Sequence, residues 1–233
     1  SWWSDIEISP NGTPYVIVKG DGNGVSCGAS MEVFKYINSQ WTSTGVLNGL
    51  GSLLQSPVIG FDNQSMPMIV YKSSNDSIVT ETYDGNIWYI SGEFGQGEHP
   101  DIAIDKNGIV YLSYTTFGPV GDPNIEFRRL DNPTPYYEVW SYLPGCQASV
   151  FSGDYASILF DQNNQLYVSL EYPDQYISTY IWDSNNACNW TQLGVVYEVE
   201  GHKPEISISE NGELYLAANA CNTCSGAALY MYD

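Results

Sequence analysis

Basic residues are scarce in this chain. Its 233 residues include 7 Lys or Arg against 27 Asp or Glu, which gives a formal net charge of −20 with His counted as neutral. A surface of this sign repels the phosphate groups of nucleic acids and of anionic membranes. We therefore expect neither nucleic-acid binding nor membrane insertion. The acidic composition fits a secreted protein in calcium-rich or saline surroundings, and solubility alone explains it equally well.

Long apolar segments and helical periodicity are also missing. No apolar run approaches the roughly 18 residues that a membrane span needs, and no secretory leader is visible in the sequence. The first residue is Ser rather than Met, which predicts a processed or excised form of a longer chain. The absence of a helical period favours an all-β fold.

A short phrase recurs five times. Each copy starts with alternating apolar residues and runs into a turn, at 5–12, 58–65, 101–108, 157–164 and 205–212. A second apolar run follows each turn, at 15–18, 68–71, 111–114, 167–170 and 215–218. Asn-Gly between alternating apolar stretches is a strong hairpin signal, because a tight turn there requires positive φ. The phrase therefore predicts five β-hairpins.

Each hairpin is followed by two further predicted strands. The third strands lie at 31–36, 78–83, 125–130, 177–182 and 228–232, and in four repeats a Trp opens a fourth strand: Trp41, Trp88, Trp140 and Trp190. Four antiparallel strands per repeat are typical of a β-propeller blade. We predict one all-β domain over 1–233, a five-bladed β-propeller of four-stranded antiparallel blades. Its repeat units are about 1–50, 51–95, 96–148, 149–198 and 199–233.

The fifth repeat reaches Asp233 without a Trp-led strand, while only two positions separate Trp3 from Asp5. We therefore predict that the last blade lacks its outer strand. An open strand edge can dock another strand or support self-association. The alternative is that the chain is a fragment of a longer protein with further blades.

The five cysteines are an odd number. Cys27 lies between the second and third strands of the first repeat, and Cys221 and Cys224 lie in the matching loop of the fifth. Because a closed ring would place these loops side by side, we expect a disulfide from Cys27 to one of the other two. Disulfide use indicates an oxidising, extracellular or cell-surface compartment. Cys146 and Cys188 fall in loops that belong to opposite faces of a propeller, so we leave them unpaired.

Four Asn-x-Ser/Thr sequences are candidate glycosylation sites: Asn11, Asn63, Asn75 and Asn189. Asn11 and Asn63 lie in turns between the first and second strands, which are accessible to modification in a secreted glycoprotein.

The position that opens the inner strand carries the sharpest chemical hypothesis. In the five repeats it is Asp5, Val58, Asp101, Ser157 and Glu205, and the residues two positions earlier include Trp3, His99, Tyr155 and Lys203. Because inner strands line the channel of a propeller, the three carboxylates are predicted to meet at one mouth. Carboxylates near aromatic residues suit glycoside hydrolysis. The alternatives are that these acids accept hydrogen bonds from backbone amides or hold calcium, the one cofactor we consider.

This layout resembles the five-bladed glycosidases of the arabinanase and invertase type, which set three acids around such a channel. The resemblance is one of architecture, because their sequence motifs are absent here and their loops are longer. The short, regular blades also resemble the tachylectin-like five-bladed lectins in size and blade count. That resemblance implies grooves between blades that each bind a sugar.

Aromatic and polar residues near the outer strands are candidates for sugar contact. They are Tyr83, Asp84, Trp88, Trp182 and Asp183, which join Trp3, His99 and Tyr155 as predicted ligand-binding residues. The alternative for the recurring Trp is packing between sheets. We predict an extracellular recognition module that binds carbohydrate or a protein partner, rather than an enzyme. A glycoside hydrolase using Asp5, Asp101 and Glu205, and a structural or adhesive component of an extracellular assembly, are the alternatives.

Overall fold

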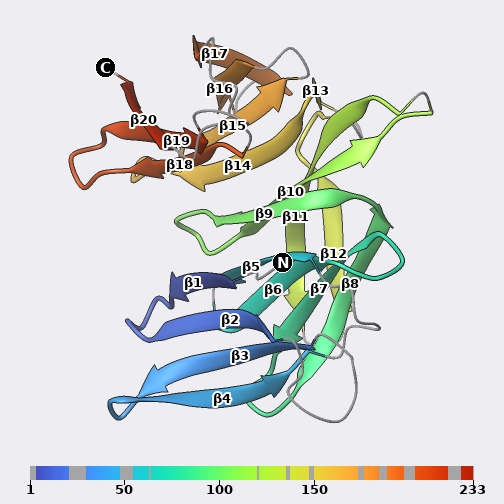
Figure 1. The fold of residues 1–233 in the computed structure, drawn as a ribbon, viewed down its shortest axis with the longest axis vertical. Coiled ribbons are helices and arrows are strands. Elements are labelled where there is room, and N and C mark those ends of the chain that lie inside the picture. The colour runs from blue at the N-terminus through green and yellow to red at the C-terminus, as the bar shows by residue number, and fades with distance from the viewer. Residues whose placement is uncertain are drawn as a thin grey trace. The chain divides into compact units, whose positions relative to one another are not determined.

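The computed structural model describes residues 4–20, 30–47, 55–62, 64–119, 121–134, 137–146, 150–172, 176–183, 188–196, 203–219 and 227–232. Within these ranges every regular element is a β-strand, from β1 to β20, which confirms the all-β prediction (Figure 1). No helix in the described ranges is long and apolar enough to cross a membrane. Predictions for Trp3, Cys27, Asn63, Cys221 and Cys224 fall outside the described residues.

The strands form five antiparallel sheets, each hydrogen-bonded in chain order. The first contains β1 (Ser4–Ile8), β2 (Pro14–Gly20), β3 (Ser30–Ile37) and β4 (Gln40–Val46). The second contains β5 (Gln55–Phe61), β6 (Pro67–Lys72), β7 (Ser77–Tyr83) and β8 (Trp88–Gln96). The third contains β9 (Glu98–Ile104), β10 (Val110–Phe117), β11 (Pro123–Thr134) and β12 (Tyr137–Tyr142), with the short β13 (Phe151–Ser152) added to β11.

The fourth sheet contains β14 (Asp154–Phe160), β15 (Leu166–Tyr172), β16 (Tyr176–Asp183) and β17 (Asn189–Val196). The fifth contains β18 (Glu205–Ile208), β19 (Leu214–Asn219) and β20 (Ala227–Tyr232). These sheets are the blades of a five-bladed β-propeller, which confirms the predicted fold and the three-stranded last blade. The predicted inner strands are β1, β5, β9, β14 and β18.

The chain divides into two compact units. The first is Ser1–Pro100, Asn107–Val110 and Leu130–Trp140, and the second is Asp101–Lys106, Tyr111–Arg129 and Ser141–Asp233. We describe each unit by itself.

In the first unit the core lies between the first and second blades. Ile17, Val33, Ile59 and Tyr71 are buried there, together with the outer-strand Trp88. Alternating residues of each strand point to one face, so this apolar period of two buries one face of each sheet against its neighbour. Burial of large aromatic side chains adds to the stability of the interface.

In the second unit the fourth and fifth blades share a smaller apolar cluster. Ile177, Leu216 and Ala218 are buried, and Tyr230 and Tyr232 of β20 pack against them. On the other side of the fourth blade, the Trp190 ring contacts the Phe127 ring with 5.2 Å between centroids.

The repeated turn between the first and second strands has a clear physical cause. The Asp62 carboxylate accepts hydrogen bonds from the backbone N–H groups of Gln64 and Met66, both at 2.8 Å. Asp161 does the same for Asn163 and Gln165, at 2.8 and 2.7 Å. Such side-chain to backbone hydrogen bonds replace the backbone hydrogen bonds that are missing at a tight turn. This explains why the first residue of the turn is Asp or Ser in every repeat.

A second repeated signal was missed at the sequence level. In three blades the fourth strand has a Gly four residues after its Trp, namely Gly45, Gly92 and Gly194. A Cβ atom at Gly92 would lie 2.6 Å from Thr80 Oγ1, and one at Gly194 would lie 2.8 Å from the Tyr232 ring. Each of these glycines also falls at a register shift between the third and fourth strands. The spacing of four residues from Trp to Gly therefore marks a bulge in the fourth strand. A side chain of a neighbouring strand lies close to the backbone there.

The structure corrects one prediction directly, because Cys146 and Cys188 form a disulfide. Their loops were assigned to opposite faces on the assumption that the link between blades runs along one face only. Instead, the chain turns at Cys146, whose N–H donates to the Leu143 carbonyl, and returns to the edge of β11 as β13. Phe151 of β13 then contacts Trp190, which follows Cys188 by two residues. Cys146 thus lies beside the sheet edge, within reach of Cys188.

This disulfide predicts a measurable stability difference. Cys146→Ser opens a loop with a sequence separation of 42 residues, and loop-closure entropy sets the expected loss at about 2–4 kcal/mol of unfolding free energy. Urea unfolding of the oxidised protein and the variant measures it. Cys188→Ser and the double variant should each match the single variant, whereas additive losses would show that the two thiols act separately.

Candidate functional site

In the described residues, the chain enters four of the five inner strands through an unusual backbone conformation. Four residues at the same repeat position have positive φ: Ser56 at 47°, His99 at 47°, Tyr155 at 46° and Lys203 at 67°. None is Gly, so the conformation of each is sterically unfavourable. The surrounding structure must hold each residue in it. In the second and fourth blades the strand register shifts at this point, which identifies a bulge. His99 and Tyr155, two predicted ligand-binding residues, therefore occupy equivalent, strained positions.

A sequence signal for these bulges exists but was not used. Pro follows Ser56, His99 and Lys203 directly, as Pro57, Pro100 and Pro204. Proline fixes its own φ and removes a backbone donor, so a recurring X-Pro pair before a strand marks a break in regular pairing. The pattern predicts where the bulge lies, although it gives no partner for the side chain there.

The carboxylates that open the inner strands bind backbone amides. Asp5 Oδ1 accepts from the N–H of Ile6 at 2.8 Å, and its Oδ2 accepts from Ile59 of the next blade at 2.9 Å. Burial raises the pKa of Asp5, and these two hydrogen bonds oppose that rise. Both oxygens thus hold two neighbouring inner strands together, which is the amide-capping alternative that the sequence left open.

Asp101 repeats this arrangement in the second unit. Its Oδ1 accepts from Ile102 at 2.8 Å and its Oδ2 from Ile158 of the next blade at 2.7 Å. Ser157 provides a neutral version, since its Oγ accepts from Ile206 at 3.3 Å. A single physical role, which is to accept a backbone N–H of the next blade, therefore explains the polar residue at this position in the first, third and fourth repeats.

The proposed meeting of Asp5, Asp101 and Glu205 stays a prediction. Asp5 belongs to the first unit and the other two to the second, and Glu205 is exposed at the start of β18. The described part of the chain holds no group of three or more His, Cys, Asp or Glu side chains arranged to bind a metal ion.

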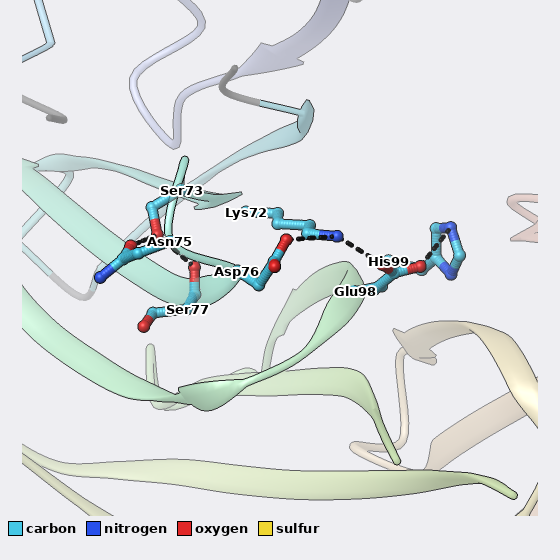
Figure 2. A network of polar contacts seen from close by, with 7 residues as sticks. All are labelled: Lys72, Ser73, Asn75, Asp76, Ser77, Glu98 and His99. Atoms are coloured by element: carbon cyan, nitrogen blue, oxygen red, sulfur yellow. Dashed lines mark hydrogen bonds and ion pairs between the residues drawn. The ribbon is translucent and has the colours of Figure 1, made fainter. Parts of the chain in front are cut away.

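Polar side chains join the second blade to the entrance of β9, as Figure 2 shows. Lys72 Nζ, at the end of β6, binds Asp76 Oδ1 at 3.0 Å and also binds Glu98. His99 Nε2 lies 3.9 Å from Glu98 Oε2. Burial disfavours the charged Lys72, but its hydrogen bonds to Glu98 and Asp76 outweigh this and raise its pKa. We call Lys72, Asp76, Glu98 and His99 the first entrance network.

The turn that carries Asp76 is held by its own hydrogen bonds. Ser73 Oγ donates to Asn75 Oδ1 and to the Ser77 carbonyl (Figure 2). The Asp76 carbonyl accepts from the N–H of Gly97 at 2.9 Å, directly before Glu98. The turn therefore fixes the carboxylate of Asp76 beside Lys72. Asn75, a predicted glycosylation site, is exposed on this turn.

The second unit contains a related arrangement. Thr115 Oγ1, at the end of β10, donates to Asp154 Oδ1 at 2.6 Å, and Asp154 also accepts from the N–H of Tyr155 at 2.8 Å. Asp154 lies directly across the strand pair from Glu171. Glu171 in turn accepts from the N–H of Lys203 at 3.4 Å. Lys203 Nζ lies 5.4 Å from the Tyr155 ring centroid. We call these five residues the second entrance network.

The two networks share one rule. The residue that follows the apolar run of a blade's second strand contacts the entrance of the next blade, as in Lys72 with Glu98 and Thr115 with Asp154. Sequence reasoning found His99, Tyr155 and Lys203 but missed these two acids and their partners. Glu98 and Asp154 lie three positions before Asp101 and Ser157, so a column-by-column comparison of the repeats would have found them.

The outer-strand candidates have packing roles in the structure. Trp88 is buried, with its Nε1 donating to Thr44 Oγ1 of the first blade at 3.2 Å. Trp182 is also buried, and Asp84 Oδ1 accepts from the N–H groups of Asn86 and Ile87 in the turn between β7 and β8. Burial favours the packing interpretation of the two Trp residues, while ligand binding by Tyr83, Asp84 and Asp183 stays a prediction.

No protein-family model matches the sequence, and no curated protein matches it significantly. Solved structures do match in fold. A protein of unknown function from Dyadobacter fermentans is 13% identical with a TM-score of 0.69, over 98% of this chain and 75% of that one. A mutant of AofleA from Arthrobotrys oligospora is 11% identical with a TM-score of 0.67, over 98% and 68%.

The GH93 α-L-arabinofuranosidase of Fusarium graminearum, in complex with arabinobiose, is a further match. It is 12% identical with a TM-score of 0.63, over 98% of this chain and 75% of that chain. At these identities the likeness is one of fold, and a shared fold does not by itself carry an activity. The comparisons therefore place the chain among β-propellers.

The amide-binding role of Asp101 predicts a stability loss. Asp101→Ala leaves the N–H groups of Ile102 and Ile158 without their acceptor, which we expect to cost about 2–3 kcal/mol of unfolding free energy. Denaturant unfolding measures this cost. Ser157→Ala is the matched comparison and should cost less, about 1 kcal/mol, because it removes one neutral acceptor. An equal or smaller loss for Asp101→Ala would contradict the assignment.

The first entrance network predicts a pH dependence. The raised pKa of Lys72 stabilises the folded state below the ordinary Lys value and loses that effect as the pH rises through the folded-state pKa. Lys72→Met should lower the unfolding free energy by about 1 kcal/mol at pH 7, because its partners are partly exposed. Urea unfolding from pH 7 to strongly alkaline pH should show the wild-type advantage vanish. An advantage that is constant with pH would rule out the charge interaction.

Proposed function

We propose that the protein is a secreted carbohydrate-recognition module that binds neutral saccharides at its entrance networks. The observation that carries this proposal is the second entrance network. It brings the Tyr155 ring, the Lys203 ammonium group and the carboxylates of Asp154 and Glu171 onto adjoining strands. A sugar needs an apolar ring to cover its C–H face and polar groups to bind its hydroxyls, and this network offers both.

The strained backbone supports a ligand-binding role for these side chains. Strained non-Gly residues with positive φ persist only where the surrounding structure fixes them. They cluster at ligand-binding and active sites. The bulge at Tyr155 turns its side chain away from regular strand alternation, and Lys203 has the same positive φ just before β18. His99 holds the same repeat position in the first unit, so it is the corresponding candidate in the first entrance network.

Two further observations support a carbohydrate ligand and a secreted protein. The matching solved structures include the arabinofuranosidase bound to arabinobiose, and several others whose names are those of glycosidases. The Cys146–Cys188 disulfide favours an oxidising compartment. The net charge of −20 disfavours polyanionic saccharides, so we propose a neutral ligand.

Glycoside hydrolysis is the second candidate. Burial raises the pKa of Asp5, as a general acid requires. Against this role, both oxygens of Asp5 accept backbone N–H groups, which favour the ionised carboxylate over the protonated form that a general acid needs.

A binding and hydrolysis assay distinguishes the two candidates. Calorimetric titration with neutral arabinan, xylan and galactan oligosaccharides should give binding without release of reducing ends. Tyr155→Ala should weaken binding about tenfold or more, because the loss of one stacked ring removes a hot-spot contact. Tyr36→Ala is the matched control, since Tyr36 is an exposed aromatic residue of an outer hairpin.

Three outcomes decide the proposal. Binding that Tyr155→Ala leaves unchanged would refute the second entrance network as the site. Reducing ends that are released by the wild type but not by Asp5→Asn would favour the hydrolase. Binding that is lost in a calcium chelator and restored by calcium would assign the ligand site to a bound cation.

A further inference from the structure

The outer side of β20 is an open strand edge in the described part of the chain. β20 pairs with β19 on one side, and no described strand pairs with its other side. Its six residues include no charge, Pro or Gly, and its register with β19 runs from Asn219↔Ala227 to Leu214↔Tyr232 without a shift. Natural edges are usually blunted by charge, Pro or a bulge, so a regular and uncharged edge is a template for another strand.

The fourth blade holds this edge strand in place. The Tyr232 hydroxyl hydrogen-bonds with Thr179 Oγ1 at 2.8 Å, and its ring lies against Gly194 of β17. On the opposite face of β20, Leu229 and Met231 are 70% and 55% exposed. β20 is therefore held in place through one face and exposed on the other, so a partner strand would meet a preformed template with little ordering cost.

The other blades define the chemistry of the strand that fits this edge. In the first, second and fourth blades the third strand places an aromatic residue directly across from the outer-strand Trp, in the pairs Tyr36↔Trp41, Tyr83↔Trp88 and Trp182↔Trp190. Tyr232 holds the corresponding position, because Tyr215↔Met231 matches Tyr15↔Lys35 and Tyr167↔Ile181 in register.

The same comparison predicts a Gly in the strand that would pair with the outer edge of β20. Gly45, Gly92 and Gly194 lie across from Val33, Thr80 and Thr179, three residues before the third-strand aromatic. The corresponding residue of β20 is Leu229. We propose that the outer edge of β20 binds an extended polypeptide segment with the pattern Trp-x-x-x-Gly, antiparallel, with its Trp across from Tyr232 and its Gly across from Leu229.

Charge defines the partner further. The net charge of −20 repels a second copy of this chain, so the segment belongs to a neutral or basic partner. Backbone hydrogen bonds along the edge provide the affinity, and the Trp and Gly positions provide the register, as in other strand-addition complexes.

The test uses the full protein and a synthetic peptide with the sequence of residues 189–196, flanked by Lys and labelled with a fluorophore. Fluorescence anisotropy should show saturable binding of one peptide per chain. Trp190→Ala in the peptide should weaken binding about tenfold or more, because it removes a large apolar contact. Gly194→Val in the peptide should weaken it by a similar factor, because a side chain there blocks the bulge.

Two peptides that are N-methylated at alternate residues test the strand geometry. Only every second N–H of an edge-bound strand points toward the template, so one peptide should lose binding and the other should keep it. Equal loss in both peptides, or in neither, would overturn the proposal.

Protein variants locate the site. Leu229→Glu should weaken binding of the peptide about tenfold, since charge on an edge strand opposes pairing. Ile87→Glu, at a residue that is 50% exposed in the turn before β8, is the matched control and should bind as the wild type does. Unchanged binding by Leu229→Glu would overturn the proposal. So would a concentration-dependent dimer of the unliganded protein that Leu229→Glu abolishes, because the edge would then belong to a second copy.

Discussion

The inner edges of three sheets, at β5, β14 and β18, are held by hydrogen bonds to a side chain of the preceding blade. β1, β5, β9, β14 and β18 are first strands and therefore sheet edges, so their outward N–H groups have no ladder partner within the blade. An unsatisfied buried N–H costs about 1–3 kcal/mol. Asp5, Asp101 and Ser157 meet this demand by accepting the amides of Ile59, Ile158 and Ile206. These three polar residues thus have a structural role, because each joins its blade to the next one.

Because of this structural role, Asp5 and Asp101 are weaker candidates for catalysis than the sequence suggested. Asp5 and Asp101 already use both carboxylate oxygens to bind backbone, which leaves the surfaces beside them to contact a ligand. The entrance networks lie at those surfaces, where His99, Tyr155 and Lys203 have positive φ. The structural role and the proposed ligand-binding role therefore fall on neighbouring positions of the same segment, separated by two or three residues.

The outer strands follow a similar logic from blade to blade. The Gly of each Trp-x-x-x-Gly strand leaves room for a neighbouring side chain, as Gly194 does for Tyr232. Trp88 reaches back to Thr44 of the preceding blade. The third strand of a four-stranded blade pairs with a strand on each side. In the described residues β20 pairs with β19 only, so its outer edge is that of a third strand without its fourth.

The sequence alone determined the all-β class, the five blades and their strand order, because Asx turns and alternating apolar residues act over a few positions. It also placed His99, Tyr155 and Lys203 at one repeat position. Only the tertiary structure decided that Asp101 binds the amide of Ile158, that Lys72 lies between Asp76 and Glu98, and that Cys146 pairs with Cys188. These contacts join residues 4 to 57 positions apart in the chain, and several join different blades. Their partners depend on how bulges and links bend the backbone, which local patterns do not encode.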